Sequence, residues 1–506
     1  MLLHPRKVVV IGAGPAGLTA AYELCKVGIP CVVLEKDPVV GGLARTVHYK
    51  GYHFDIGGHR FFTKVKRVED MWREVLPTGQ FLRRPRLSRI YYNKRFFYYP
   101  LRASNALFGL GIWNSFLVVL SYIKTQLMPT LPEETFDRWV SNRFGSRLFE
   151  IFFKTYTEKV WGIPCNEIMA EWAAQRIQGL SLFSAVKNAL LPQSTGPRST
   201  MIKTLVDEFD YPERGPGMLW ERVVEIIQSK GAEVRLEAHV KRILWDDGKV
   251  RAVETDVDGR VQRVEGTHFI SSMPIRELIE KLDPPPPARV LEAAMSLHYR
   301  DFLTVALIID HPDLFPDNWI YIHDPAVKVG RIQNFKNWSP NMVPDPSKTC
   351  LGLEYFCFEG DDLWNMSDTA LAALGAREVE ALGLARASAV EDSAVVRMPK
   401  AYPVYDAPYT GALRTIRNFL DGLDNLQLVG RNGLHKYNNQ DHSMLTAMLA
   451  VQNLMGANFD IWAVNEEQEY HEAVRREDSE DSGAEEFTRL ASTQPQVPLR
   501  KPRDAS

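Results

Sequence analysis

The sequence predicts an α/β protein built around a parallel sheet that inserted segments interrupt. The stretch KVVVIGAGPAGLTAAYELCKVGIPCVVLEK, residues 7–36, is typical of a strand, a tight glycine turn, a helix and a second strand. The later stretch GTHFISSMP, residues 266–274, is typical of a strand that returns to the same sheet. A length of 506 residues exceeds a single compact core, so we expect several domains.

The composition is that of a globular protein with no general attraction for nucleic acid. Hydrophobic residues make up 45% of the chain and charged residues 24%, and the formal net charge is -3. We therefore expect no nucleic-acid partner. The five cysteines form no CxxC pair, and the first residues run directly into a strand without a signal-peptide pattern. These features favour a cytoplasmic protein and leave the number of subunits open.

The longest apolar run is ALFGLGIWNSFLVVLSYI, residues 106–123. It approaches the length of a membrane span, but Gly, Asn and Ser residues interrupt it. We expect no transmembrane span and interpret the run as a buried helix or a lid. Contact with one face of a membrane is the alternative, which the low positive charge of the flanks disfavours.

The first glycine turn has the features of a dinucleotide-binding site. Gly12 permits the turn, Gly14 lets backbone amides approach a pyrophosphate, and Gly17 allows the helix to pack closely on the strand. The amino terminus of the following helix favours an anion. Glu35 ends the second strand, about 20 residues further on, where its carboxylate can accept hydrogen bonds from ribose hydroxyls.

A second glycine-rich segment distinguishes between the candidate cofactors. In VVGGLARTVHYKGYHFDIGGHRFF, residues 39–62, Gly42 and Arg45 follow soon after the acidic residue, and Gly57 and Gly58 form a second pair. This spacing resembles that of the amine-oxidase and protoporphyrinogen-oxidase-like FAD superfamily. In that superfamily the segment lies along the pyrophosphate and reaches the flavin ring. The resemblance implies FAD as the cofactor.

We expect a Rossmann-like FAD-binding domain interrupted by a helical substrate domain and a β-sheet substrate domain. Helical periodicity marks residues 132–180, Asp258-Gly259 is a hairpin signal, and DPPPPA at 283–288 marks a connection. The polar, acidic stretch from residue 464 has no periodic apolar face. The expected segments are FAD-binding at 1–75, 215–282 and 416–463, mainly helical at 76–214, β-sheet at 283–415, and a disordered tail at 464–506.

Several separated blocks, in the same order, resemble the UDP-galactopyranose mutase family, and its eukaryotic-type branch above all. GGHRFF at 57–62 resembles the GGH loop of that family, and RFFYYP at 95–100 resembles its YPF segment. TYTEKVWGIP at 155–164 is similar to the KVW-x-x-P stretch. Further similarity lies in YPERGPGM, in WIYIHDPAVKVGRIQNF and in the carboxy-terminal HKYNNQDHS. The resemblance covers about residues 7–456.

The resemblance implies a nucleotide-sugar substrate and a reaction without net redox change. In this family, reduced flavin attacks the anomeric carbon through N5, and a nucleoside diphosphate leaves. The sugar ring then opens and closes again through another hydroxyl, which interconverts pyranose and furanose forms. Such chemistry needs a nucleophile aligned with the anomeric carbon and cations that balance the diphosphate. The GGH loop of the family lies beside flavin N5, so His59 would approach the flavin. The external reductant is unknown.

The site residues of the family carry over to matching positions. Arg176 and Arg331 match two arginines that clamp the diphosphate, where forked guanidinium donors suit phosphate oxygens. The implied catalytic residues are His59, Arg176, Arg331, Tyr321, Tyr402 and Tyr437. The implied substrate-binding residues are Tyr99, Arg102, Phe152, Trp161, Arg176, Arg331, Tyr402 and Tyr437, with a place in the core as the alternative for Phe152 and Trp161. The implied cofactor-binding residues are Gly12, Gly14, Gly17, Glu35, Gly42, Arg45, Gly57, Gly58, His59, Gly430, Arg431, Asn439, Gln440, Asp441, His442 and Ser443.

The sequence departs from the family pattern at two positions and carries one insertion. Arg102 replaces the glutamine after YPF, and Thr157 replaces the asparagine before KVW, both where the family contacts uridine. These changes leave the nucleotide and the sugar open. Residues 181–210 lengthen the chain after Arg176 and are consistent with either a lid or a surface excursion.

Other function classes fit parts of the sequence. A redox flavoenzyme, such as a desaturase or an amine oxidase, would use the same FAD frame but would need an apolar or amine pocket. A noncatalytic flavin-binding partner would give the diphosphate clamp no purpose. His435 and His442 lack a convincing ligand set, so we predict no metal. The sequence also lacks a nucleophile elbow for Ser-His-Asp chemistry.

Overall fold

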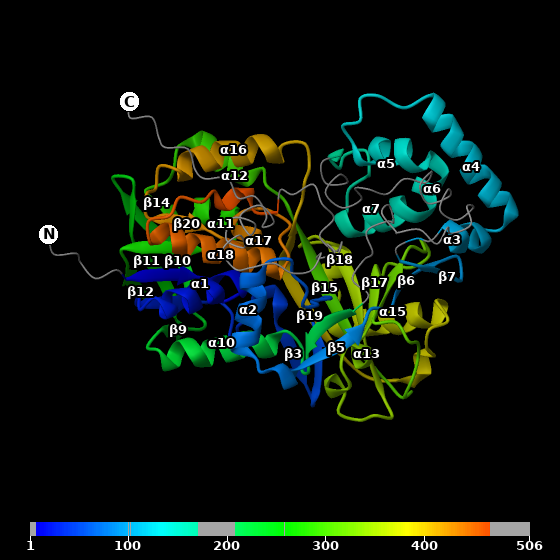
Figure 1. The fold of residues 1–506 in the computed structure, drawn as a ribbon, viewed down its shortest axis with the longest axis horizontal. Helices are drawn as coiled ribbons and strands as arrows, with labels where there is room; N and C mark the ends of the chain where they lie inside the picture. Colours follow the sequence, from blue (N-terminus) through cyan, green and yellow to red (C-terminus); the bar gives the residue numbers. More distant parts are fainter. Residues whose placement is uncertain (1–6, 100, 102, 171–207, 258, 466–506) are drawn as a thin grey trace, which may run out of the picture.

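Three larger sheets organise the residues that the computed structural model describes, which are 7–99, 101, 103–170, 208–257 and 259–465 (Figure 1). Arg102, Arg176, most of the 181–210 insertion and almost all of the predicted tail therefore lie outside the described residues. Two short ribbons, β3–β4 and β5–β8, complete the strands of the described part. Their bounds are β3 Thr46–Tyr49, β4 Tyr52–Asp55, β5 Phe81–Pro85 and β8 Glu208–Pro212.

The first sheet is parallel throughout and has the order β20-β13-β1-β2-β9. Its strands are β1 Val8–Ile11, β2 Cys31–Leu34, β9 Glu233–Arg235, β13 His268–Ser271 and β20 Leu426–Leu428. Every residue of β1 is buried, as expected for a parallel sheet that is covered on both faces. Val8 pairs with Cys31 on one side and with His268 on the other. The structure thus confirms both the strand–turn–helix–strand prediction and the returning strand in GTHFISSMP.

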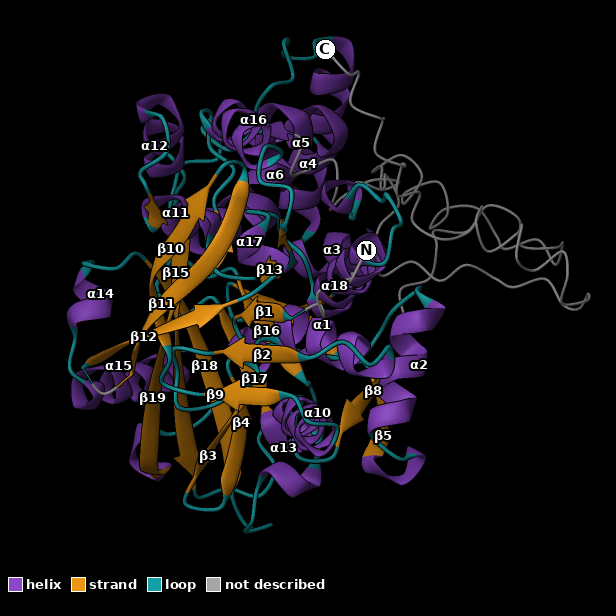
Figure 2. Ribbon diagram, turned by 90° about the vertical axis from the view of Figure 1, so that its left-hand side faces the viewer, coloured by secondary structure: helices purple, strands orange, loops and turns teal. Residues whose placement is uncertain are grey.

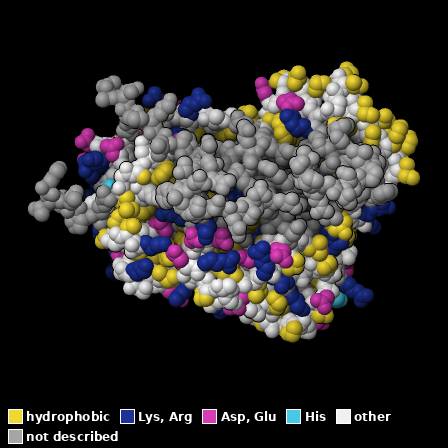
Figure 3. All heavy atoms as spheres, in the orientation of Figure 1, with side chains coloured by type: hydrophobic (Ala, Val, Ile, Leu, Met, Phe, Trp, Pro, Cys, Tyr) yellow, Lys and Arg dark blue, Asp and Glu magenta, His cyan; other side chains and the backbone are white. Residues whose placement is uncertain are grey.

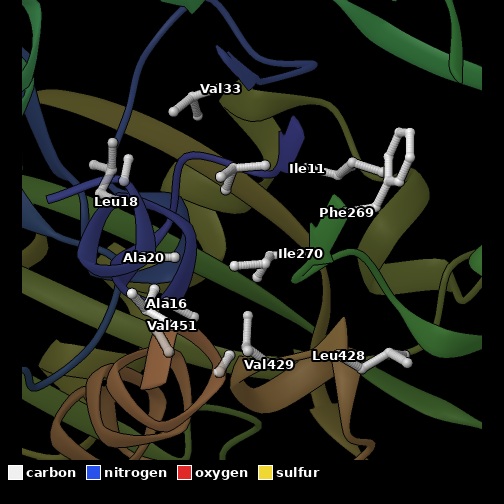
Figure 4. Packing of buried hydrophobic residues seen from close by; sticks show 14 of the residues in the cluster. Ile11, Ala16, Leu18, Ala20, Val33, Phe269, Ile270, Leu428, Val429 and Val451 are labelled. Atoms are coloured by element: carbon white, nitrogen blue, oxygen red, sulfur yellow. The ribbon is translucent and has the colours of Figure 1, made fainter. Parts of the chain in front are cut away.

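Helix α1, Pro15–Lys26, packs against two helices from distant parts of the sequence, α10 Gly217–Ser229 and α18 Gln440–Leu454. Figure 4 shows Ala16 and Ala20 of α1 close to Val451 of α18, with Ile270 and Val429 nearby. Small side chains on α1 allow this close approach. The packing brings the carboxy-terminal motif beside the first glycine turn.

The second sheet has the order β12-β11-β10-β14. Its strands are β10 His239–Asp246, β11 Lys249–Val257, β12 Arg260–Glu265 and β14 Leu282–Asp283. Strands β11 and β12 are antiparallel, with Val257 opposite Arg260, and Gly259 has a φ of +75°. The hairpin that we predicted at Asp258-Gly259 is confirmed by this pairing.

The third sheet is mixed and has the order β19-β15-β18-β17-β16-β6-β7. Its strands are β6 Ser88–Tyr92, β7 Arg95–Tyr98, β15 Tyr299–Ile309, β16 Trp319–Ile322, β17 Arg331–Asn334, β18 Thr349–Cys357 and β19 Val390–Pro403. Every residue of β15 and β18 is buried. Helix α15, Asp368–Ala381, packs on β15 and β19. In Figure 2 the long strands of this sheet run crosswise to β1, β2 and β9.

Two of these strands come from the segment that we expected to be mainly helical. Strands β6 and β7 form a hairpin in which Tyr92 pairs with Arg95, and Asn93 and Lys94 both have positive φ. Positive φ at both central residues is typical of a tight two-residue turn. Residues 76–214 therefore contribute strands as well as helices, because β6 pairs with β16 of a later segment.

A group of helices, at the upper right of Figure 1, packs against β6 and β7 and shares a core with Ile90 and Phe97 of these strands. Its helices are α3 Ala103–Leu110, α4 Ile112–Leu127, α5 Phe136–Phe144, α6 Ser146–Phe149 and α7 Thr155–Trp161, with a π-helical turn at Glu150–Lys154. Phe136, Trp139, Val140 and Phe144 are buried, as the helical periodicity predicted. The remaining helices are α2 Lys66–Val75, α11 Ile275–Glu280, α12 Ala288–Met295, α13 Phe335–Trp338, α14 Asp362–Asn365, α16 Tyr409–Leu420 and α17 Gly430–Gly433.

The apolar run at 106–123 forms parts of α3 and α4, which meet at Gly111 with a φ of +81°. The prediction of a buried helix is wrong for α4, because Val118 is its one buried residue and the side chains of Ile112 and Leu127 are 93% and 77% exposed. High apolar content had suggested burial, but it does not determine which face of a helix meets the protein. In the described part of the chain, no helix has the length and hydropathy to cross a membrane.

Candidate active site

Two glycines at the turn between β1 and α1 have no room for a side chain. A Cβ on Gly17 would lie 1.8 Å from the Gly12 carbonyl oxygen, and a Cβ on Gly12 would lie 2.2 Å from Ser272 Oγ. Gly12 also has a φ of +99°, which glycine adopts without strain. Helix α1 begins directly afterwards, and the first N–H groups of a helix have no partner within it. The geometry of the turn therefore fits a phosphate group.

Backbone amides hold Glu35 at the end of β2. Its Oε2 accepts a hydrogen bond from the Ala13 amide at 2.6 Å, and its Oε1 accepts one from the Asp37 amide at 3.0 Å. Burial raises the pKa of this carboxyl group, although the two amides oppose the shift. A carboxylate has about four lone-pair sites, so these bonds leave acceptor capacity for a ribose hydroxyl. The ribose contact stays a prediction.

The second glycine-rich segment lies against the first turn. The Gly41 amide donates to the Ala13 carbonyl at 2.8 Å, and a Cβ on Gly42 would lie 3.0 Å from the Gly14 Cα. Arg45 closes this segment by donating from Nε to the Gly42 carbonyl at 2.7 Å. The two glycine motifs thus form one cradle, as the sequence implied for a dinucleotide.

The carboxy-terminal motif reaches the same region at the start of α18. The Asn439 amide approaches His442 Nδ1 at 3.4 Å, so His442 caps the helix. Gln440 lines a pocket that is also lined by His59, Arg331 and Tyr402. Among the described residues, neither the side-chain oxygen nor the side-chain nitrogen of Gln440 has a hydrogen-bond partner. A buried carboxamide without partners is costly unless a ligand satisfies it. Gln440 is therefore well placed to bond a cofactor.

The GGH loop forms one wall of the pocket. Gly57, Gly58 and His59 all line it, and His59 Nδ1 is buried without a hydrogen-bond partner among the described residues. Burial, together with the charges of Arg431 and Arg331, lowers the pKa of His59 to about 3. The ring is therefore neutral at physiological pH and offers one donor and one acceptor.

Side chains in register across the third sheet supply another part of the pocket lining, and one of them supports it from behind. Tyr321 of β16 pairs with Arg331 of β17, which pairs with Glu354 of β18. Arg331 Nε donates to Glu354 Oε2 at 2.6 Å, and Gln333 donates to the other oxygen. Although burial alone would lower the pKa of Arg331, the fully buried carboxylate of Glu354 raises it well above its ordinary value. The guanidinium thus stays charged and fixed at the pocket.

Two tyrosines and a second arginine complete the pocket. The rings of Tyr402 and Tyr437 stack with centroids 5.3 Å apart and planes 13° apart, and the Arg431 guanidinium lies 4.8 Å from the Tyr437 centroid. Arg431 donates to the Asn438 and Ala401 carbonyls at 2.8 and 3.0 Å. Burial raises the pKa of Tyr402, so its hydroxyl keeps its proton and can act as a donor.

The remaining predicted residues take different places. Trp161 is buried behind the tyrosines, with its ring centroid 6.5 Å from that of Tyr402. Tyr99 lies 4.7 Å from Tyr321, centroid to centroid. Phe152 packs on Phe97 at 5.0 Å in the core of the helical group, so the core alternative describes its position. Arg176 and Arg102 lie outside the described residues, and their roles stay predictions.

Motif reading missed several residues of the pocket. Trp319 and Phe302 line it, and Glu354 fixes Arg331 from behind. The one signal for Glu354 was its place as the single charged residue of the apolar strand TCLGLEYFC, since a buried charge needs a partner. Tyr156, whose ring centroid is 5.4 Å from that of Tyr321, supports the pocket from behind; it stands inside the TYTEKVWGIP block but was not singled out there.

A metal centre finds no support among the described residues. His435 contacts the Val404 carbonyl through Nε2 at 3.3 Å, whereas His442 caps α18. The described part of the chain has no group of three His, Cys, Asp or Glu side chains that could hold an ion. The five cysteines, all in described residues, are free.

Comparisons with known proteins identify the family. The model of the family "Flavin containing amine oxidoreductase" matches residues 15–435. The chain is 25% identical over 321 residues to the L-amino acid oxidase bordonein-L of Crotalus durissus terrificus, covering 59% of this chain and 56% of the oxidase. It is 26% identical over 277 residues to a lycopene-forming phytoene desaturase of Pseudescherichia vulneris, covering 51% and 54%. The chain thus spans little more than half the length of these curated relatives.

A solved structure extends the likeness over nearly the whole fold. The crystal structure of reduced UDP-galactopyranose mutase superposes with a TM-score of 0.76 at 21% identity, covering 89% of this chain and 96% of the mutase chain. At this identity the likeness establishes the fold alone. Together with the glycine cradle and the family match, it establishes that the chain is a flavoprotein with FAD as its cofactor and that it belongs to the flavin-containing amine oxidoreductase family.

Proposed function

We propose that the chain is an FAD-dependent nucleotide-sugar mutase that interconverts pyranose and furanose ring forms. The observation that carries this proposal is Arg331, which its buried partner Glu354 holds in the lining of the pocket that the GGH loop also lines. A fixed guanidinium beside a flavin site suits a substrate with an anionic handle. UDP-galactose or a related nucleotide sugar has such a handle in its diphosphate.

The cofactor would lie between the glycine cradle and the pocket. Gly12, Gly14 and Gly17 would hold its pyrophosphate, Glu35 its ribose, and Gln440 the polar edge of its ring. When bound and reduced, the flavin supplies a nucleophilic nitrogen for the anomeric carbon. The unpartnered carboxamide of Gln440 supports this placement.

The residues of the chain would then bind and orient the substrate. Arg331 would balance the charge of the departing diphosphate, and Tyr402 and Tyr437 would donate hydrogen bonds to its oxygens. His59 is neutral, so it would accept or donate one hydrogen bond beside the cofactor without adding charge. Arg176 would provide the second cation of the clamp.

A second candidate is an amine-oxidase-type oxidoreductase. The sequence relatives include an L-amino acid oxidase and a phytoene desaturase. Within this class, Arg331 favours oxidation of an amino acid over desaturation of a hydrocarbon. A guanidinium binds a carboxylate as well as a phosphate, but a hydrocarbon offers it no partner. Net flavin reduction by an L-amino acid would identify this alternative.

The decisive experiment offers a panel of nucleoside-diphosphate pyranoses to protein reduced with dithionite, with oxidised protein as the control. Chromatography and NMR follow the ring form of the product. Isomerisation that depends on reduction supports the mutase. Flavin reduction by an L-amino acid, with no sugar rearrangement, would assign the protein to the oxidoreductases instead.

The assignment of Arg331 can be tested separately. Arg331→Ala removes hydrogen bonds to a charged group, each about 1.5–3 kcal/mol, so affinity for the nucleotide sugar should fall about 10- to 100-fold while bound FAD is retained. Arg331→Lys keeps the charge that Glu354 needs and guards against misfolding. Arg222→Ala, an exposed arginine on α10, is the control. Unchanged affinity in both Arg331 variants would remove this residue from the site.

A further inference from the structure

Helix α4 exposes an apolar face to solvent. Ile112, Trp113, Phe116, Leu120, Ile123 and Leu127 are all exposed, and at 3.6 residues per turn they fall on one face. The exposed apolar surface continues at Met128 and Leu131, which are 73% and 72% exposed. Helix α4 forms the outer rim of the helical group in Figure 1, and hydrophobic side chains gather along that rim in Figure 3.

Several uncharged polar side chains of α4 bond to neighbouring helices instead. Gln126 Nε2 donates to the Asn142 carbonyl of α5 at 2.6 Å. Ser121 Oγ lies 2.9 Å from Ser146 Oγ and accepts from the Arg147 amide at 3.0 Å. Neighbouring helices thus satisfy these groups, whereas a helix that faced water would turn them outward. Simple solvation does not explain an apolar outer face.

The charged residues of the segment that contains this face are all basic. Residues 75–132 contain no Asp or Glu. Exposed Lys124 lies on α4, and the β6–β7 turn places exposed Lys94 and Arg95 beside the helical group, where Arg95 Nη1 donates to the Gly109 carbonyl at 2.5 Å. Glu133, the first acid after α4, is paired with Arg143 at 2.8 Å. A cationic rim around an apolar ridge complements a surface of anionic headgroups.

The alternative occupant, a second copy of the chain, fits this face less well. One face of a 16-residue helix is about 24 Å long and about 10 Å wide, or about 240 Å², whereas a stable protein interface takes about 800 Å² from each partner. Such interfaces also carry about one hydrogen bond per 100–200 Å². The outward face offers almost no side-chain donors or acceptors, and acyl chains need none.

We propose that the outward face of α4, continued by Met128 and Leu131, inserts into one leaflet of a membrane with anionic headgroups. The helix lies in the membrane surface and does not cross it. Lys94, Arg95 and Lys124 meet the headgroups while the apolar ridge enters the acyl region. This docking is independent of the reaction in the pocket, so it holds for a mutase and for an oxidoreductase alike.

Vesicle flotation of the FAD-loaded protein tests the proposal. Wild type should float with phosphatidylcholine vesicles that contain phosphatidylglycerol. The double variant Trp113→Ser, Leu127→Ser should lose more than about 100-fold in partitioning, because each side chain withdrawn from the acyl region accounts for at least about tenfold. Val261→Ser, on β12, is the matched control, since Val261 is 70% exposed and lies in the second sheet and not in the helical group. Bound FAD and the thermal midpoint verify that each variant folds.

Four results would overturn the proposal. Wild-type protein does not dock on lipid if it stays in the aqueous fraction both with vesicles that contain phosphatidylglycerol and with vesicles of phosphatidylcholine alone. If Val261→Ser loses as much vesicle partitioning as the double variant, the apolar face of α4 has no specific role in docking. Light scattering that finds a wild-type dimer, which the double variant breaks into monomers without vesicle binding, assigns the face to a second copy. Equal binding to vesicles of phosphatidylcholine alone would refute the role of the cationic rim.

Discussion

At the scale of a residue, sequence motifs predicted Arg331 but not its partner Glu354. Arg331 stands in a recognisable block, so its place at the pocket could be expected from the sequence. Glu354 lies 23 positions further on, and only the strand register brings it to Arg331. The carboxylate of Glu354 holds the guanidinium of Arg331 in one position. Removing one partner of such a buried pair costs about 3–5 kcal/mol.

Asp55 is a second buried carboxyl group, and it gives a prediction about pH. It accepts hydrogen bonds from Thr46 Oγ1 at 2.8 Å and from the Tyr211 hydroxyl, and burial raises its pKa to about 7. Between the ordinary value of 3.8 and about 7, the folded chain holds a proton that the unfolded chain has lost. Stability from this group is therefore complete below about pH 4 and falls as the pH rises to 7, by about 4 kcal/mol.

Asp55→Asn cannot titrate, so it isolates this effect. We expect the thermal midpoint of the variant to improve relative to wild type between about pH 5 and about pH 8. The control is Asp345→Asn, because a hydrogen bond from Ser347 lowers the pKa of Asp345 and leaves it ionised at both pH values. A constant difference between Asp55→Asn and wild type across this range would contradict the prediction.

At the scale of elements, local patterns predicted local structure well. The β1–α1–β2 unit, the β11–β12 hairpin and the returning strand β13 each depend on signals within a short stretch, and each was confirmed. The exposed face of α4 could not be predicted in this way, because the same apolar run would suit a buried helix. The row of Tyr321, Arg331 and Glu354 depends on which strands pair, and that is a property of the whole sheet.

Lys159 joins the helical group to the third sheet, and its loss should loosen that joint. From α7 its Nζ donates to the Asp324, Ile322 and Val329 carbonyls at 2.6, 3.2 and 3.2 Å. Lys159→Met keeps the length of the side chain but leaves buried carbonyls without a donor. We expect a loss of about 1–3 kcal/mol in stability and faster amide hydrogen exchange at residues 322–330.

Lys328→Met is the matched control for this prediction, because Lys328 lies in the same loop and is exposed. The control should leave both the thermal midpoint and the exchange rates near those of wild type. Equal effects in the two variants would show that the loop responds to any lost charge, and the tether from α7 would then have no part.

At the scale of the whole molecule, the proposed cofactor site is assembled from distant parts of the chain. The parallel sheet takes strands from residues 8–34, 233–271 and 426–428, and the pocket adds groups from the GGH loop and from α18. No single segment can form the site alone. A cofactor bound at the proposed site would connect segments that lie far apart in the sequence, and its binding would stabilise their common arrangement.

Removing FAD should thus lower the thermal midpoint, and adding it back should raise the midpoint with concentration. At 100 times the dissociation constant, binding contributes about 2.7 kcal/mol. Gly17→Ala should abolish this dependence, because its Cβ would lie 1.8 Å from the Gly12 carbonyl oxygen. Gly411→Ala is the control, since a Cβ there on α16 meets nothing within 4 Å, and it should keep the full dependence. If Gly17→Ala responded to FAD as wild type does, the phosphate cradle would have to lie elsewhere, since no rearrangement short of moving α1 away from β1 would accommodate that methyl group.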